Sequence, residues 1–191
     1  MPLNVLASDT SARLAPVEQR FAPLFCFALL TSACGLASFV FACATPFAAF
    51  AVLAVAMLPL RSALLPVLGA WLINQAIGFG VQHYPVDANT ITWGLAIGVA
   101  ALVATVVASL MLRALPRSGT PVALALALLG AYVSYEIVLF AVTPFLGGEG
   151  AFTVAIIARL GALSTLWLVG LVAVAEVFRV AWNVRRRTTT A

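Results

Sequence analysis

The chain has 191 residues, of which 64% are hydrophobic and only 8% are charged. A soluble domain carries about a quarter charged residues, so ten arginines and six acidic residues cannot cover a water-facing surface of this size. The composition therefore excludes a soluble enzyme, a nucleic-acid-binding protein and a disordered regulator. It predicts an integral membrane protein whose main partner is the lipid bilayer.

The first twenty residues contain charges and prolines but no apolar core, so we expect a short cytoplasmic lead over residues 1–20 rather than a cleavable signal. The stretch from Ser11 to Arg20 is compatible with an interfacial helical turn and with a frayed tail, and the sequence leaves both open. The transmembrane domain is expected over residues 21–184, and a basic cytoplasmic tail over residues 185–191.

Long apolar runs fill the rest of the chain, and a helix needs about twenty such residues to cross a hydrocarbon core of roughly 30 Å. The second run has sixteen residues, about 24 Å as a helix, which a thinner bilayer can accommodate. Strands of a membrane β-barrel alternate in segments of about ten residues, unlike these uniformly apolar runs. We predict an all-α bundle of six transmembrane helices over Phe21–Cys43, Thr45–Leu60, Ala63–Tyr84, Ile91–Leu115, Pro121–Phe145 and Phe152–Trp182.

The placement of the arginines favours six spans. The loops His83–Thr90 and Leu146–Ala151 then carry only Asp87 and Glu149 as charged residues. Arginine-rich loops face the cytoplasm, so we expect both termini there, in a multi-pass protein of the bacterial inner membrane. Without the second span, the arginines of the lead would lie opposite the others. The arginines assigned to the cytoplasmic side are Arg13, Arg20, Arg61, Arg113, Arg117, Arg179, Arg185, Arg186 and Arg187.

Small residues recur at helical spacing in three of the predicted helices. Ala33-x-x-x-Ala37 lies in the first helix and Gly94-x-x-x-Gly98 in the fourth. In lipid, helices associate where small residues let their backbones approach closely. These residues are therefore predicted to pack helices, either inside the bundle or against a partner. The stripe in the fifth helix consists of Ala123, Ala127 and Ala131.

Two charged residues lie inside predicted helices without a topological reason. Glu136 lies about 13 Å from the outer end of the fifth helix and Arg159 about 10 Å from the outer end of the sixth, at 1.5 Å per residue. A charge at the centre of such a helix costs about 2.5–3.5 kcal/mol. Because the two helices are consecutive and antiparallel, we predict that Glu136 and Arg159 form an ion pair.

Uncharged polar and aromatic residues are predicted at a similar depth. Asn74 and Gln75 lie about 15 Å from the same side in the third helix. Trp71 lies one turn before Gln75, and Tyr132 lies one turn before Glu136. Two interpretations remain open: a ligand pocket that opens outward, or a structural lock in which Asn74 binds between the two charges of the ion pair.

The sequence argues against an enzyme. It has a single histidine, His83, and neither a Gly-x-Ser-x-Gly nor a His-Glu-x-x-His motif. Its three cysteines lack Cys-x-x-Cys spacing, so we predict no catalytic residue, metal site or cofactor. A channel needs polar lining along its whole length, which the inner halves of the helices lack. No internal repeat is visible, which argues against a carrier built from two inverted halves.

The chain length, the six spans, the inward termini and the outward pocket together resemble the substrate-binding S components of energy-coupling factor (ECF) vitamin transporters. Ala33-x-x-x-Ala37 is similar to the small-residue pattern of their first helix, which meets a transmembrane coupling subunit. The resemblance implies a transport protein that captures a vitamin or a metal-related micronutrient from the outer side for uptake. The residues that would then touch the substrate are Glu136, Arg159, Asn74, Gln75, Trp71 and Tyr132.

An accessory or assembly subunit of a larger membrane complex is the alternative. The small-residue stripes would then be docking faces exposed to lipid, and the Glu136–Arg159 pair would be structural. The partner in that case would be another membrane subunit or a second copy of this chain.

Overall fold

A computed structural model describes residues 13–41 and 45–189, and this part of the chain is all-helical, as predicted. Predictions for residues 1–12, 42–44 and 190–191, which include Cys43, lie outside the described residues. All the α-helices except α2 are long and apolar enough to cross a membrane, which makes five candidate spans in the described chain. The elements are α1 (Ala22–Phe41), α2 (Phe47–Met57), α3 (Leu60–Gly80), α4 (Ala88–Ala114), α5 (Thr120–Leu146), the 3₁₀ turn η1 (Glu149–Ala151) and α6 (Val154–Thr189).

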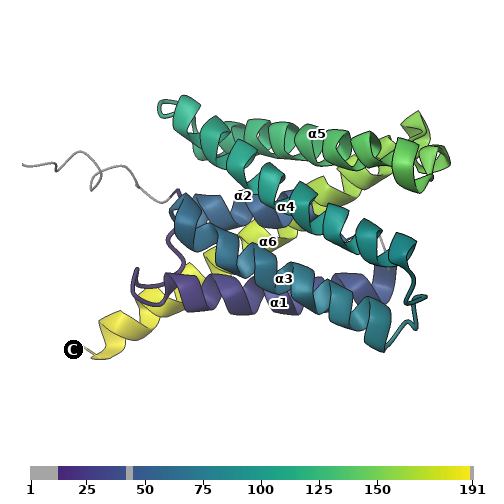
Figure 1. The fold of residues 1–191 in the computed structure, drawn as a ribbon. Coiled ribbons are helices and arrows are strands. Elements are labelled where there is room, and N and C mark those ends of the chain that lie inside the picture. Colours follow the sequence, from purple (N-terminus) through teal and green to yellow (C-terminus); the bar gives the residue numbers. More distant parts are fainter. Residues whose placement is uncertain (1–12, 42–44, 190–191) are drawn as a thin grey trace, which may run out of the picture.

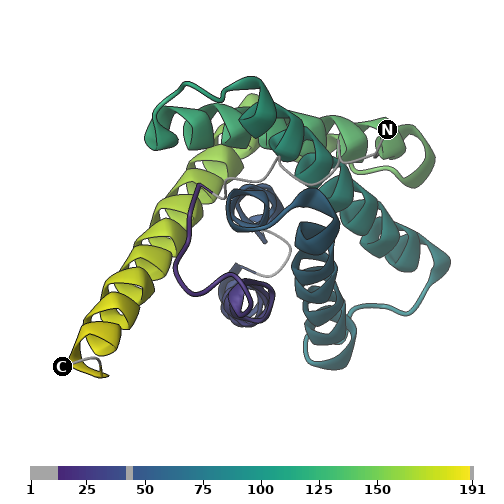
Figure 2. The same cartoon turned by 90° about the vertical axis from the view of Figure 1, so that its left-hand side faces the viewer.

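Helix α2 lies at the centre of the bundle and the longer helices surround it (Figures 1 and 2). It contacts all five of them, and ten of its eleven residues are buried. Its two phenylalanines, Phe47 and Phe50, are among the largest fully buried side chains. The apolar core of the protein is therefore built around this short helix.

In the second predicted span, Thr45–Leu60, the helix is shorter than predicted and is surrounded by the other helices. The helix has eleven residues and a length of about 16 Å, well short of a bilayer. Pro46 precedes it, and Leu58 is held in an extended conformation before Pro59, as expected of a residue that precedes proline. Non-helical backbone is tolerated at membrane depth where protein covers it, and the longer helices provide that cover.

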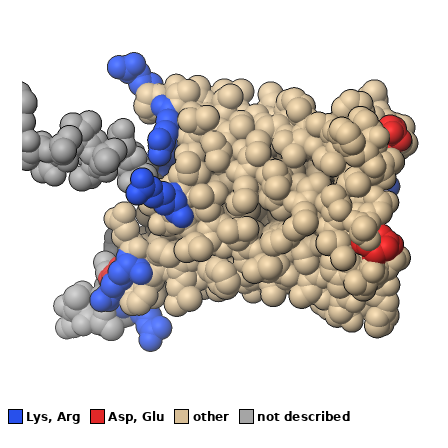
Figure 3. Space-filling view, in the orientation of Figure 1, with Lys and Arg blue, Asp and Glu red and all other residues tan. Residues whose placement is uncertain are grey.

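Most of the charged side chains visible in Figure 3 lie at the two ends of the bundle, with arginines gathered at one end. We call the end at which α1 begins the basic end, and the opposite end, which carries Asp87 and Glu149, the acidic end. The acidic residues Glu18 and Glu176 of the basic end are paired with Arg20 and Arg179, with N–O distances of 2.8 and 2.5 Å. The asymmetry that the sequence predicts is therefore present in the fold.

Residues 13–21 fold over the basic end as turns, neither a regular helix nor a frayed tail. The Arg13 guanidinium donates to the carbonyls of Ser118, at 3.1 Å, and of Leu115, at the end of α4. Leu14 is only 5% exposed, and its N–H donates to the Ala56 carbonyl of α2 at 3.0 Å. This segment covers the basic end of the central helix.

The small-residue stripes of α4 and α5 lie inside the bundle. Ala123, Ala127 and Ala131 of α5 are all 0% exposed, and α4 and α5 form the most extensive helix pair. Within this pair, Gly130 of α5 lies against Met111 and Val107 of α4, and small residues let helices approach closely. These two stripes are therefore internal packing surfaces rather than docking faces.

Helix α6 continues unbroken to Thr189, so the described part of the predicted tail is helical. At the basic end it packs on α1 through the ring pairs Phe21–Trp182 and Phe25–Phe178, with centroids 6.2 and 5.0 Å apart. Farther along, the two helices separate and leave an apolar groove of about 510 Å³ between them.

Candidate functional site

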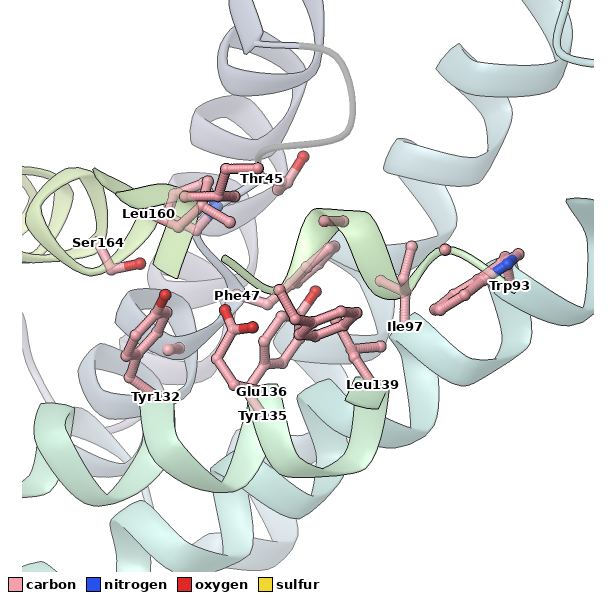
Figure 4. A pocket seen from close by; sticks show the side chains of 16 residues that line it. Thr45, Phe47, Trp93, Ile97, Tyr132, Tyr135, Glu136, Leu139, Leu160 and Ser164 are labelled. Atoms are coloured by element: carbon pink, nitrogen blue, oxygen red, sulfur yellow. The ribbon is translucent and has the colours of Figure 1, made fainter. Parts of the chain in front are cut away.

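A cavity of about 500 Å³, which we call the main cavity, lies in the half of the bundle nearer the acidic end. It is bounded by the start of α2 and by helices α4, α5 and α6. The turn η1 contributes Ala151 to its wall. The cavity is mostly apolar, with aromatic rings around much of its wall (Figure 4). The aromatic residues that line it are Phe47, Trp93, Tyr132, Tyr135 and Phe152.

Helical spacing explains why these side chains converge. On α5, the lining residues are Tyr132, Tyr135, Glu136 and Leu139. They follow at steps of three and four residues, so their side chains lie on one face of the helix. Helices α4 and α6 contribute further residues at steps of four. Those on α4 are Trp93 and Ile97, and those on α6 are Ile156, Leu160 and Ser164.

Among the described residues that line the cavity, Glu136 is the only charged one. Its carboxyl group points into the space beside Tyr132 and Tyr135 (Figure 4). The Tyr132 hydroxyl directs its proton to the Ile157 carbonyl of α6, at 2.6 Å, and so joins α5 to α6. The expected place of Glu136 and Tyr132 in a common pocket is thus matched by the fold.

The predicted Glu136–Arg159 ion pair is wrong. Arg159 is exposed, and in the part of the chain that the structure describes no ion pair joins it to Glu136. The reason is the direction in which Arg159 lies around the axis of α6. Arg159 lies four residues before Leu163, which faces the α1–α6 groove, whereas Leu160 faces the cavity. Its depth is only about 8 Å from the start of α6, within reach of the interface for a long side chain.

Trp71 and Gln75 pack α3 on α4 instead of lining the main cavity. The Trp71 indole N–H donates to the Gly94 carbonyl at 2.8 Å. A Cβ at Gly98 would lie 2.8 Å from the same indole ring, and one at Gly94 would overlap the Gln75 side-chain oxygen. Gly94 and Gly98 thus provide the space that these two side chains fill.

Asn74 binds hydroxyl groups rather than charges. Its side-chain amide donates to Ser38 Oγ and to Thr45 Oγ1, both at 3.0 Å, and its oxygen accepts from Gln75 Nε2 at 3.0 Å. Gln82 adds a bond to the Ser38 carbonyl at 2.8 Å. The amide therefore joins α3 to α1 and to Thr45, which lies two residues before α2. Because Thr45 also lines the cavity, Asn74 is a positioning residue for the cavity wall.

Ala33 and Ala37 of α1 have different surroundings. Ala37 is fully buried. Ala33, 8% exposed, lines the groove between α1 and α6, together with Gly170 and Trp167. Neither residue lines the main cavity.

A second cavity of about 270 Å³ lies between α3 and α4 toward the acidic end. Asn74 and Gln75 form part of its wall, and it shares Trp93 and Ile97 with the main cavity. Next to it, Asp87 begins α4: its carboxylate accepts the Thr90 N–H at 2.8 Å, and this hydrogen bond lowers the pKa of Asp87. The two cavities are thus neighbours separated by side chains of α4.

Sequence reasoning missed Phe47, Trp93, Tyr135 and Ser164 as cavity residues. The four-residue spacing of Trp93 and Ile97 is a usable signal, but an aromatic in an apolar helix faces lipid as readily as a cavity. Ser164 is 5% exposed, and its hydroxyl makes no hydrogen bond within the described chain. Its burial depends on the approach of α6 to α2, which the sequence alone does not reveal.

The described residues contain no group of three or more histidine, cysteine or acidic side chains that could hold a metal ion. Cys26 and Cys34 are buried free thiols, and Cys34 donates to the Ala70 carbonyl at 2.9 Å. Comparison of the chain with known protein families, curated proteins and solved structures finds no match. Any function must therefore be argued from the cavity itself.

Proposed function

We propose that this chain is a membrane transport protein that captures a small molecule at its acidic end. In this proposal it works in the manner of an ECF substrate-binding subunit, in the bacterial inner membrane. The main cavity is the observation that carries the proposal. Its volume of about 500 Å³ lies within the range of about 300–1,000 Å³ that is typical of small-molecule sites. Its apolar wall with few polar groups is also typical of such sites.

The position of the cavity supports a binding protein over a channel. Helix α2 fills the centre of the bundle, and Leu14 covers its end near Ala56. A conducting pore needs a continuous polar lining, and the buried residues of α2 are all apolar. A molecule held in the cavity therefore has no open path to the basic end.

The charge asymmetry supports the orientation of the proposal. Arginines collect on the cytoplasmic side of membrane proteins, so the basic end faces the cytoplasm and the cavity lies toward the outside. Both termini are then cytoplasmic. The chain crosses the bilayer six times in this proposal, and α2 makes its crossing inside the protein.

Native mass spectrometry of protein purified in mild detergent tests the proposal. We expect a small molecule to remain bound to the wild type and to the Glu149→Gln variant, whose changed residue is exposed at the same end. Glu136→Gln should lose it, because that side chain points into the cavity. A wild-type protein that carries no small molecule and takes none up from a metabolite extract would contradict the proposal.

An accessory subunit of a larger complex is the second candidate, and the α1–α6 groove favours it. The groove is apolar, holds about 510 Å³ and contains Ala33 and Gly170, small residues of the kind found where membrane helices meet. Purification of the chain with a membrane partner and without any small molecule would support this candidate.

A further inference from the structure

We propose that the main cavity is selective for a small organic cation, whose charge rests on Glu136 and whose body lies among the aromatic rings. This inference rests on the capture function proposed above and narrows its substrate class. It is carried by the charges and rings of the cavity wall.

The described residues of the cavity wall carry negative charge and no positive charge. In residues 13–41 and 45–189, Glu136 is the only charged side chain that lines the cavity. The arginine nearest to it in the chain, Arg159, is exposed on a different face of α6. Glu136 is half-buried, and a partly desolvated carboxylate is stabilised by a positive charge beside it. No arginine is among the described residues that line the cavity, so a cationic ligand would supply that charge.

The Glu136 carboxylate keeps acceptor positions for a ligand beyond its interaction with the Tyr132 side chain. The one proton of the neighbouring Tyr132 hydroxyl is directed to the Ile157 carbonyl at 2.6 Å. An ionised carboxylate accepts hydrogen bonds through about four lone-pair positions. An ammonium or a protonated ring nitrogen can donate to these positions, and such charge-assisted bonds are about twice as strong as neutral ones.

The rings around Glu136 suit the same ligand. Phe47 and Tyr135 lie with their centroids 6.4 Å apart and form one part of the wall. Trp93 and Tyr132 approach from α4 and from the other side of Glu136 (Figure 4). An organic cation within about 6 Å of such a ring gains about 0.5–2 kcal/mol. The rings and the carboxylate therefore favour the same sign of charge.

The same wall disfavours other ligand classes. An anion would be repelled by Glu136 with no arginine among the described lining residues to balance it, and a neutral molecule would gain no charge–charge attraction from the carboxylate. An inorganic divalent ion needs several oxygen, nitrogen or sulfur ligands, but the described residues contain no cluster of three candidate ligand side chains.

Three probes with the same phenylethyl skeleton test the inference: 2-phenylethylammonium, 2-phenylethanol and 3-phenylpropionate. Equilibrium dialysis against the full chain in lipid nanodiscs measures their affinities. We expect the ammonium probe to bind the wild type at least about tenfold more tightly than the alcohol, and the propionate to bind least. Glu149→Gln should keep this preference, and Glu136→Gln should lose it.

The order in which the wild type binds the three probes tests the cation inference even if Glu136→Gln fails to fold. Equal or tighter binding of the alcohol or the propionate overturns the cation inference and leaves the capture function standing. If no probe binds, the molecule that co-purifies with the wild type decides: a cation supports the inference, and a neutral or anionic molecule overturns it alone. Absence of both probe binding and a co-purifying molecule overturns the capture function as well.

Discussion

The indole nitrogen of Trp71 donates a hydrogen bond to the main-chain carbonyl of Gly94, 2.8 Å away, and so holds α3 against α4. The contact is close because α4 has no side chain at Gly94 or at Gly98. This explains why the glycine pair predicted from the sequence matters for the fold. It also places Trp71 in a packing interface rather than in the main cavity.

Gly98→Ala tests this interface. The added Cβ would lie 2.8 Å from the Trp71 ring, and overpacking of this kind costs about 1–3 kcal/mol. We expect a lower thermal midpoint by circular dichroism in detergent. Gly35→Ala is the control, because nothing lies within 4 Å of its added Cβ. An unchanged midpoint for Gly98→Ala would show that α3 and α4 do not pack this closely.

Asn74→Leu should destabilise the protein and also weaken ligand binding. The change leaves the hydroxyls of Ser38 and Thr45 without their donor, and a buried polar group that loses its partner costs about 1–3 kcal/mol. Binding should weaken because Thr45 lines the cavity. The exposed Asn89→Leu serves as control. Full stability together with full binding in Asn74→Leu would argue against the positioning role.

Arg159→Ala should change little. The side chain is exposed and has no ion pair with Glu136, and exposed substitutions usually stay within about 0.5 kcal/mol. We expect normal folding and normal binding of the co-purifying molecule, whereas Glu136→Gln should lose that molecule. If Arg159→Ala unfolds the protein and the double change with Glu136→Ala restores it, a Glu136–Arg159 lock exists after all.

Arg13→Ala should loosen the basic end. The guanidinium donates to carbonyls at the end of α4, where the last carbonyls of a helix lack partners within the helix. Because the group is only partly buried, we expect a loss of about 1 kcal/mol in the free energy of unfolding by denaturant titration. Arg117→Ala, exposed at the same end, should have no effect. Equal effects of the two changes would indicate a general loss of charge.

The long helices could be predicted because their apolar runs are long and their ends carry charges, prolines or glycines. Glu136 and Tyr132 could be predicted as cavity-lining residues for a related reason, since a polar group within an apolar run stands out. The orientation of Arg159 and Trp71 could not, because it depends on the rotation of each helix about its own axis. Residues on every face of these helices are apolar, so periodicity does not reveal that rotation.

The central position of α2 could not be predicted for the same reason. A helix apolar on all sides is suited to lipid and to a protein core alike. Its two bounding prolines, Pro46 and Pro59, do indicate its length. Burial on every side, however, arises only when the other helices close around it.

Ala51→Leu tests whether protein surrounds α2 on all sides. Ala51 is 0% exposed, so three extra carbon atoms have no space there, and overpacking costs about 1–3 kcal/mol or more. The same change at Ala76, exposed on α3, should be tolerated because its side chain would meet lipid. We expect Ala51→Leu to lower the yield of monodisperse protein in size-exclusion chromatography and its thermal midpoint. If Ala51→Leu behaves like Ala76→Leu, α2 faces lipid, and a cavity built around its first turn cannot have the form described.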